Sequence, residues 1–246
     1  MARTPTRTRR RKRAPRKAKP RTRNELYIDI ARWTLTGALL FFLACRLMSR
    51  TPAVVLPKTP LESLEAGHPL PREIAERLNA VEWKNRADGR LGLWVSVHWQ
   101  RIFGIEGGVV KFIYPCSTAA RGVGNRENSK QTPLGWHEIV ERIGDGLPEG
   151  AVFNERRYTG RVWNPGEKTE KDYVLSRILW LRGMEPGVNA GPGIDSHDRY
   201  IYIHGTPAEE RIGRPASLGC IRMLNRDVVE LFPQAPLGTP VLITEW

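Results

Sequence analysis

Residues 199–223 read RYIYIHGTPAEERIGRPASLGCIRM, and the interpretation of the whole chain depends on them. Aromatic and β-branched residues over 200–203 suit a pleated, half-buried surface and predict a strand. That strand ends at His204, because Gly205-Thr206-Pro207 are turn formers. A polar loop then leads to the turn Ser217-Leu218-Gly219-Cys220. The stretch therefore predicts a histidine at a strand end and a cysteine at a glycine-flanked turn, joined by a loop that returns one toward the other.

This pairing of residue types indicates thiol chemistry. A catalytic thiol needs a base that takes its proton, and a bare turn that exposes the sulfur beside backbone N–H groups. Gly219 removes side-chain bulk next to Cys220, and Ser217 and Arg222 add polar groups around it. Residue types alone leave the structural alternative open, because a buried cysteine usually packs as a small hydrophobe. A nucleophile–base pair of Cys220 and His204 is the hypothesis that the rest of the chain has to support.

The charge of the chain is concentrated at its start. The 246 residues carry a net charge of +13, but residues 1–23 hold twelve Lys or Arg and no acid, so the remainder is close to neutral. Residues 1–25 are low in apolar residues and predict a disordered basic tail. Such a tail also suits anionic lipid, the cytosolic side of a membrane segment, or an upstream region before a later translation start. We expect no nucleic-acid partner.

An apolar segment follows the tail. Residues 33–45, WTLTGALLFFLAC, carry no charge and lie between Arg32 and Arg46. A spanning helix needs about 20 apolar residues, so this run fits a signal-peptide core better than a full span. We interpret residues 26–48 as a signal peptide or membrane anchor that leaves the N-terminus cytoplasmic and the rest exported. A buried core helix, and lipidation at Cys45, are the alternatives.

The remainder reads as a linker and one β-rich domain. Residues 49–89 are Pro-rich and contain a short amphipathic helix over 71–84. Residues 90–246 predict many short strands separated by glycine turns, with no βαβ alternation, which indicates a mainly β, sandwich or barrel-like domain with few short helices. The expected strands are 91–98, 99–104, 109–114, 132–143, 152–158, 173–183 and 241–244, and one helix is expected over 225–232 with Asn225 as its N-cap.

Other chemistries find no support in the sequence. There is no phosphate-binding loop, no dinucleotide fingerprint and no CxxC pair. The remaining histidines show no metal-ligand spacing, so we expect no metal and no cofactor. Three cysteines are too few for a disulfide scaffold, and we expect Cys116 and Cys220 to be free thiols.

Three ordered segments resemble a known family. The pattern of HG(T) after an apolar strand, followed by S-x-GC-I-R-M, resembles the signature of L,D-transpeptidase catalytic domains of the YkuD type. Residues 94–118, which end in YPCSTA, are similar to the family's opening hairpin and S-T-G segment, and residues 132–135, TPLG, to its T-P-x-G segment. The resemblance covers residues 90–246 and implies a β-rich fold with few helices.

The resemblance also implies a reaction. Such enzymes act on peptidoglycan stem peptides: Cys220 attacks the carbonyl that precedes a D-residue, forms a thioester, and passes the acyl group to an amine. His204 is then the base or proton shuttle, and as an imidazolium it would lower the pKa of the thiol. Backbone N–H groups at Gly219 and Cys220 are expected to stabilise the oxyanion.

The flanking residues carry over with less definite roles. Arg222 is expected to bind a substrate carboxylate or to brace the loop, Gly205 or Thr206 to orient the imidazole through a carbonyl or hydroxyl, and Ser217 to contribute to the same substrate and oxyanion site. Leu218 departs from the pattern, because the usual motif has a second histidine there. We expect a protein on the wall side of the inner membrane, or in the periplasm, that contacts the membrane through its apolar segment. Hydrolysis of the same bond and catalytically weak wall binding remain alternatives.

Overall fold

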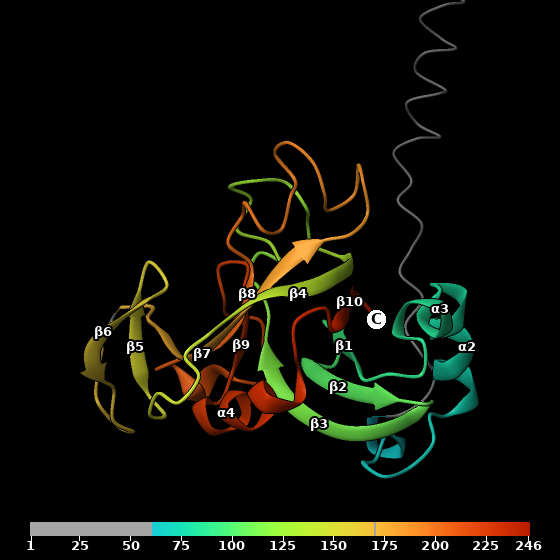
Figure 1. Cartoon of the computed structure of the whole chain (residues 1–246), viewed down its shortest axis with the longest axis horizontal. Helices are drawn as coiled ribbons and strands as arrows, with labels where there is room; N and C mark the ends of the chain where they lie inside the picture. The colour runs from blue at the N-terminus through green and yellow to red at the C-terminus, as the bar shows by residue number, and fades with distance from the viewer. Residues whose placement is uncertain (1–60, 170) are drawn as a thin grey trace, which may run out of the picture. The chain divides into compact units, whose positions relative to one another are not determined.

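The computed structural model describes residues 61–169 and 171–246, all within the second of two compact units, Val54–Trp246. The basic tail and the apolar segment predicted over 1–48 lie outside the described residues. Within the described ranges, no helix is long and apolar enough to cross a membrane. Figure 1 shows the arrangement of the elements.

Ten strands and a few short helices make up the described part. The strands are β1 Gly92–Ser96, β2 Arg101–Glu106, β3 Val109–Ser117, β4 Gly135–Ile143, β5 Ala151–Asn154, β6 Arg157–Val162, β7 Val174–Gly183, β8 Tyr202–Gly205, β9 Ile221–Met223 and β10 Pro240–Thr244. The helices are α2 Arg72–Ala80, α3 Trp83–Ala87 and α4 Asn225–Gln234, with 3-10 turns η1 Leu61–Ser63 and η2 Glu209–Arg211. The prediction of a mainly β domain with few short helices is confirmed.

Eight of the described strands close into a barrel. Their order is β4-β10-β1-β2-β3-β9-β8-β7, and β7 pairs back with β4. Within this sheet β1 pairs with β10 in parallel and β8 pairs with β9 in parallel, whereas the other pairs are antiparallel. Of the two predicted architectures, sandwich and barrel, the pairing of β4 with β7 selects the barrel. Strands β5 and β6 form a hairpin beside the barrel, where β5 pairs with β7 (Figure 1).

The barrel core follows the alternation of the strands. Leu93 and Val95 of β1 point into the main core, as the period-two pattern predicts, whereas Trp94 points to the other side. That side is also buried, because helix α2 covers it with Ile74 and Leu78 and helix α3 covers it with Trp83. The helix predicted over 71–84 is thus two helices, divided where Glu82 adopts a left-handed conformation with φ 63°.

Two local predictions are wrong. The strand expected over 152–158 is the hairpin β5–β6, because Glu155 and Arg156 both adopt positive φ and turn the chain back on itself. Asn225 is not an N-cap: helix α4 begins at Asn225, Leu224 is the capping position, and the Asn225 side chain bonds elsewhere. The strand expected over 173–183 is confirmed as β7.

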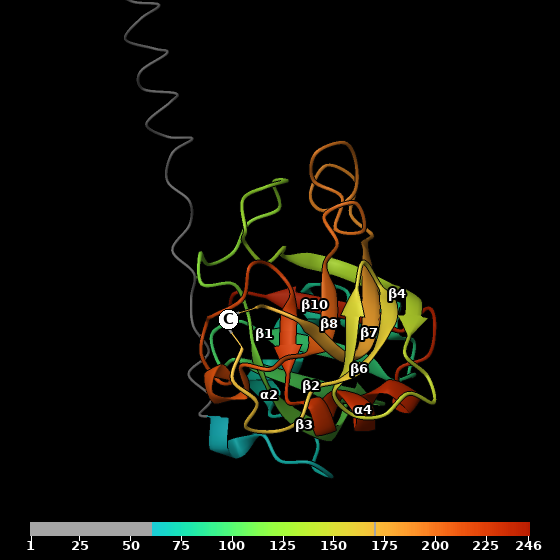
Figure 2. The same ribbon diagram turned by 90° about the vertical axis from the view of Figure 1, so that its left-hand side faces the viewer.

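Two long loops project from the same end of the barrel, visible in green and orange in Figures 1 and 2. The first joins β3 to β4 and the second joins β7 to β8. They contact one another, because Asn125 Nδ2 donates to Val188 O at 2.7 Å and Glu127 N donates to Gly193 O at 2.7 Å. This end of the barrel therefore carries a connected pair of loops close to the start of β8.

Candidate active site

His204 of β8 and Cys220, the residue immediately before β9, face the same side of the sheet. The parallel register pairs Ile203 with Ile221 and His204 with Arg222. Ile203 and Ile221 point into the barrel core, so side-chain alternation turns His204, Cys220 and Arg222 outward on the opposite face. Cys220 packs there against the cluster that contains Tyr202. The fold thus brings the predicted nucleophile and base to adjacent strands on the same side.

The turn before Cys220 is held by the two other segments of the resemblance. Thr118 O accepts hydrogen bonds from Ala216 N at 2.8 Å and Ser217 N at 2.9 Å. Thr132 Oγ1 donates to Gly219 O at 3.0 Å. Ser217 Oγ donates to Cys220 O at 2.6 Å and accepts from Gly219 N at 3.1 Å. The three segments, far apart in the sequence, therefore meet around the thiol, and Ser217 fixes the turn.

Glycine is required at position 219. Its φ is +138°, a conformation that L side chains rarely adopt, and a Cβ there would lie 3.3 Å from Ile201 Cδ1. Its N–H already donates to Ser217 Oγ. In this conformation Gly219 N–H is therefore occupied, and of the two predicted oxyanion donors only the N–H of Cys220 remains as a candidate. Leu218, in place of the usual histidine, is 60% exposed and makes no part of this turn's hydrogen bonding.

The His204 imidazole is held in one tautomer. Its Nδ1 lies 2.7 Å from Gly205 O, and because a carbonyl only accepts, Nδ1 must carry the proton. Nε2 is then the acceptor, as a base for a thiol requires. The prediction of a third group that orients the imidazole is thus met by the Gly205 carbonyl, whereas Thr206 Oγ1 instead accepts from Ala208 N at 3.2 Å. Burial lowers the pKa of His204 to about 4, and the Gly205 carbonyl opposes that shift.

The Cys220 thiol is protonated in the resting protein. Burial raises the pKa of Cys220 to about 11, partly opposed by a backbone hydrogen bond from Tyr202 and by Arg222. The sulfur lies 3.3 Å from Tyr200 O and donates to it. The directions of these two pKa shifts favour a neutral imidazole and a neutral thiol in the resting protein, rather than the expected imidazolium beside a thiol of lowered pKa.

Arg222 braces the motif. Its Nη2 forms an ion pair with Asp172, and its Nη1 donates to Ala216 O at 3.2 Å. Arg222 is 6% exposed, so the guanidinium is enclosed and its outer nitrogens are engaged. Of the two predicted roles, bracing and carboxylate binding, the contacts favour bracing. Asp172, which the sequence reading missed, lies in a charged loop with no pattern that would have indicated it.

Asn225 is a second residue that sequence reasoning placed wrongly. Its side chain is buried, donates through Nδ2 to Thr206 O at 2.9 Å and to Glu209 Oε1 at 2.8 Å, and accepts from Ser176 Oγ at 2.6 Å. A Cβ on Gly205 would lie 2.3 Å from Asn225 Oδ1. Asn225 therefore anchors the segment whose carbonyl sets the His204 tautomer, and it needs glycine at position 205 to approach so closely.

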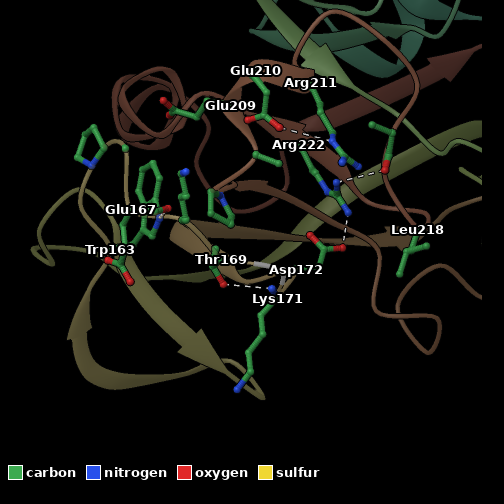
Figure 3. Close-up of a pocket in the computed structure, with 16 residues that line it drawn as sticks. Trp163, Glu167, Thr169, Lys171, Asp172, Glu209, Glu210, Arg211, Leu218 and Arg222 are labelled. Carbon is green, nitrogen blue, oxygen red and sulfur yellow. Dashed lines mark hydrogen bonds and ion pairs between the residues drawn. The ribbon is translucent and has the colours of Figure 1, made fainter.

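A pocket of about 770 Å³ opens next to the motif (Figure 3). Its wall includes Arg222 and Leu218, the loop between β6 and β7 with Asp172, and the segment 207–211 after β8. Acidic and basic side chains both line it. The pocket offers space for a polar, charged molecule next to Leu218 and Arg222, whereas His204 and Cys220 are not among the residues that line it.

Acid conditions are expected to destabilise the fold through two buried imidazoles. Burial lowers the pKa of both His204 and His137 to about 4, whereas an unfolded histidine titrates near 6.5. Between about pH 6.5 and 4 only the unfolded chain binds these protons. The free energy of unfolding therefore decreases as the pH is lowered, by up to about 1.4 kcal/mol per pH unit for each imidazole.

Urea unfolding at pH 7, 6, 5 and 4.5 measures this slope. His137 lies far from the thiol in the sequence and forms hydrogen bonds with Gly135 O and Ser196 Oγ. The variant His137→Asn therefore removes one of the two buried imidazoles and keeps the other. We expect that variant to lose about half of the slope, whatever its absolute stability. A wild-type stability that stays constant from pH 7 to 4.5 would contradict buried neutral imidazoles.

The fold and this site define a β-barrel protein with a candidate thiol nucleophile and an oriented imidazole on the barrel's outer face. Comparison with protein families then gives the class: residues 91–243 match the family model described as YkuD, L,D-transpeptidase catalytic domain. Because the match covers more than half of the chain, the protein belongs to this family, which is a family of cysteine enzymes. The family resemblance drawn from the three sequence segments is confirmed.

Individual relatives cover the chain only in part. "Probable L,D-transpeptidase ErfK/SrfK" of Salmonella typhimurium is 32% identical over 143 residues, which is 54% of this chain and 40% of that protein. "Probable L,D-transpeptidase YbiS" of Escherichia coli K12 is 30% identical over 121 residues, 48% of this chain and 35% of that protein. The matched region thus spans less than half the length of these curated relatives.

Solved structures are more distant. The crystal structure of L,D-transpeptidase 3 from Mycobacterium tuberculosis in complex with a faropenem-derived adduct has a TM-score of 0.41 at 14% identity, over 63% of this chain and 60% of that one. A likeness at this level supports no conclusion about activity.

Proposed function

We propose that this protein is a peptidoglycan L,D-transpeptidase that works through a thioester on Cys220. The observation that carries the proposal is the parallel pairing of β8 with β9, which turns His204 of β8 and Cys220, the residue before β9, to the same outer face, with the imidazole held in the tautomer of a base. The pocket lined by Leu218 and Arg222, which lie two residues before and after Cys220 in the sequence, gives a stem peptide room close to the motif. Family membership supports the substrate class.

The resting charges set the order of proton transfers. With a neutral thiol and a neutral imidazole, His204 Nε2 takes the thiol proton as Cys220 Sγ attacks the peptide carbonyl. The tetrahedral oxyanion then collapses, the proton passes from His204 to the departing amine of the D-residue, and the thioester remains. An acceptor amine attacks the thioester, His204 removes its proton, and the new amide leaves as the proton returns to Cys220 Sγ.

The neutral pair has a consequence for selectivity. A preformed thiolate reacts with many electrophiles, whereas this thiol becomes nucleophilic only when a carbonyl is in place and His204 accepts the proton in the same step. Gly205 O stabilises the imidazolium that forms, because it already accepts a hydrogen bond from His204 Nδ1 at 2.7 Å.

We propose that the domain acts on the wall side of the inner membrane, delivered there by the N-terminal apolar segment.

Product analysis tests the proposal. The purified chain is incubated with a disaccharide tetrapeptide, and the products are separated and weighed by mass spectrometry. We expect a cross-linked dimer that has lost one terminal D-alanine, formed in proportion to enzyme and time. Tripeptide without any dimer would show a hydrolase of the same bond instead. Complete absence of turnover, together with retained peptide binding, would support the wall-binding alternative that Leu218 suggests.

A further inference from the structure

The hairpin β5–β6 presents Arg156, on a strained turn, to the aromatic residues Trp180, Tyr200 and Tyr202. The strands are joined by Glu155 and Arg156 alone, with φ of 46° and 70°, and Asn154 pairs with Arg157 across the turn. Turns with two positive φ values favour Asn-Gly, because other side chains are strained there. Two long, charged residues in such a turn are a local cost, and strain of this kind is concentrated at functional sites.

The Arg156 side chain is aimed at the aromatic wall next to Cys220. Its guanidinium carbon lies 4.9 Å from the centre of the Trp180 ring and 5.1 Å from that of Tyr200, and Nη1 lies 3.4 Å from Tyr202 OH. Trp180 and Tyr202 belong to the buried cluster against which Cys220 packs. Tyr200, whose carbonyl oxygen accepts a hydrogen bond from the Cys220 thiol, is 53% exposed. Arg156 and the thiol thus border the same aromatic wall.

Arg156 differs from the other cations near the thiol. Arg222 is enclosed and bound to Asp172 and Ala216 O. Arg199 donates through Nη2 to Gln131 O, and its Nη1 has no hydrogen-bond partner but is buried away from the surface. Arg156 is half-buried, donates one hydrogen bond to Tyr202 OH, and within the described ranges forms no ion pair with a carboxylate. The other guanidinium N–H groups of Arg156 are therefore free, and their planar arrangement can donate two parallel hydrogen bonds to a carboxylate.

The reaction requires recognition of one carboxylate close to the thiol. In the proposed function the departing residue is the last residue of the donor peptide, so its free carboxylate lies three bonds from the carbonyl carbon that Cys220 attacks. We infer that Arg156 binds this terminal carboxylate and so selects stem peptides that end at the departing D-residue. This inference rests on the proposed function, and it assigns to Arg156 the substrate role that Arg222 is too engaged to fill.

Binding to an inactive variant tests the inference without turnover. Cys220→Ala protein is titrated by calorimetry with two tetrapeptide stems that differ only at the terminus, one a carboxylate and the other a carboxamide. We expect the carboxylate peptide to bind about 10- to 100-fold more tightly, as a charge-assisted bidentate contact would give. Adding Arg156→Gln should remove that preference by weakening the carboxylate peptide alone, and Arg156→Lys should keep part of it.

A matched control is available on the next residue. Arg157 is exposed and lies on the same hairpin, so Arg157→Gln changes the net charge equally and should leave both affinities unchanged. The inference is overturned if the parent does not distinguish the two peptides or binds neither, if Arg156→Gln weakens both alike, or if Arg157→Gln reproduces its effect. Should Arg156→Gln fail to fold, the Lys variant decides, since unchanged discrimination there also overturns the inference.

The proposed function is judged separately. Wild-type protein treated with a carbapenem reports on the Cys220 thiol by intact mass, whatever the peptide titrations show. If the adduct formed but the protein did not distinguish the two peptides, Cys220 would still be the nucleophile, and the proposed role of Arg156 would be wrong. If the protein formed no adduct and showed no turnover but still preferred the carboxylate peptide, the enzymatic assignment would be wrong. The site would then be a binding site for the carboxyl terminus of a peptide.

Discussion

Cys220→Ala protein is expected to form no covalent adduct with a carbapenem and to lose activity on stem peptides by about 10⁴-fold or more, since removal of a nucleophile eliminates the covalent route. Cys220 Sγ and the oriented His204 imidazole lie on the same face of the β8–β9 pair. Intact-mass spectrometry measures the adduct directly, and amino-acid release measures turnover. Folding should persist, because Cys220 is only partly buried at the barrel surface.

Cys116→Ala is the matched control. Cys116 is the other free cysteine of the described residues, points into the barrel core, and is fully buried. Burial raises the pKa of the Cys116 thiol far above its ordinary value, so it should not react in the folded protein. That variant should take up one carbapenem as the wild type does. An adduct on Cys220→Ala, or loss of the adduct in Cys116→Ala, would mean that the nucleophile has been assigned to the wrong residue.

His204→Gln is expected to slow adduct formation by about 10²- to 10⁴-fold near neutral pH, the range that a positioned base contributes. The pH dependence should change as well. In the wild type His204 is neutral above its pKa of about 4, so the rate should be nearly constant from about pH 5.5 to 8. Without the base, the reaction depends on ionisation of a thiol with a pKa of about 11, so the rate should rise about tenfold per pH unit.

The shape of the profile separates catalysis from folding. His137→Asn also removes a buried imidazole with a lowered pKa, and it should reduce stability while leaving the flat profile intact. Rates of carbapenem acylation, followed by mass spectrometry at each pH, give both quantities. If His204→Gln kept a flat profile, another group would have to be the base. If the wild-type rate rose with pH like the variant's, the imidazole would have no role in activating the thiol.

Local patterns explain how much of the fold was predictable. The alternation in β1 and the Gly107-Gly108 turn between β2 and β3 are encoded by neighbouring residues, and both were predicted. The choice between sandwich and barrel was not, because it depends on which edges meet, and periodicity carries no information on pairing between distant strands. The β5–β6 turn was missed for a related reason: Glu155-Arg156 lacks the glycine or asparagine that marks such turns.

The identities of the two reactive residues were predictable from the sequence, but their protonation states were not. His204 and Cys220 stood out because turn formers and glycine surround them, and the structure sets both on one face. Their protonation depends on burial, which no motif records: burial lowers the pKa of His204 and raises that of Cys220, which favours the neutral pair over the expected imidazolium. Asp172 and Asn225 act through contacts across 50 and 19 positions, to Arg222 and to the Thr206 carbonyl. Sequence spacing alone does not reveal partners at such separations.

The position of β10 determines when this domain can fold. β10 lies between β1 and β4, and Trp94 Nε1 donates to Thr244 Oγ1 across 150 positions. Before residues 240–244 have left the ribosome, β1 and β4 each have an open edge that can pair with another chain. Contacts of such long range slow folding, because the loop-closure entropy is lost before the contacts form. Barrel closure, and with it a stable nucleophile site, must therefore be a late event in the biosynthesis of this protein.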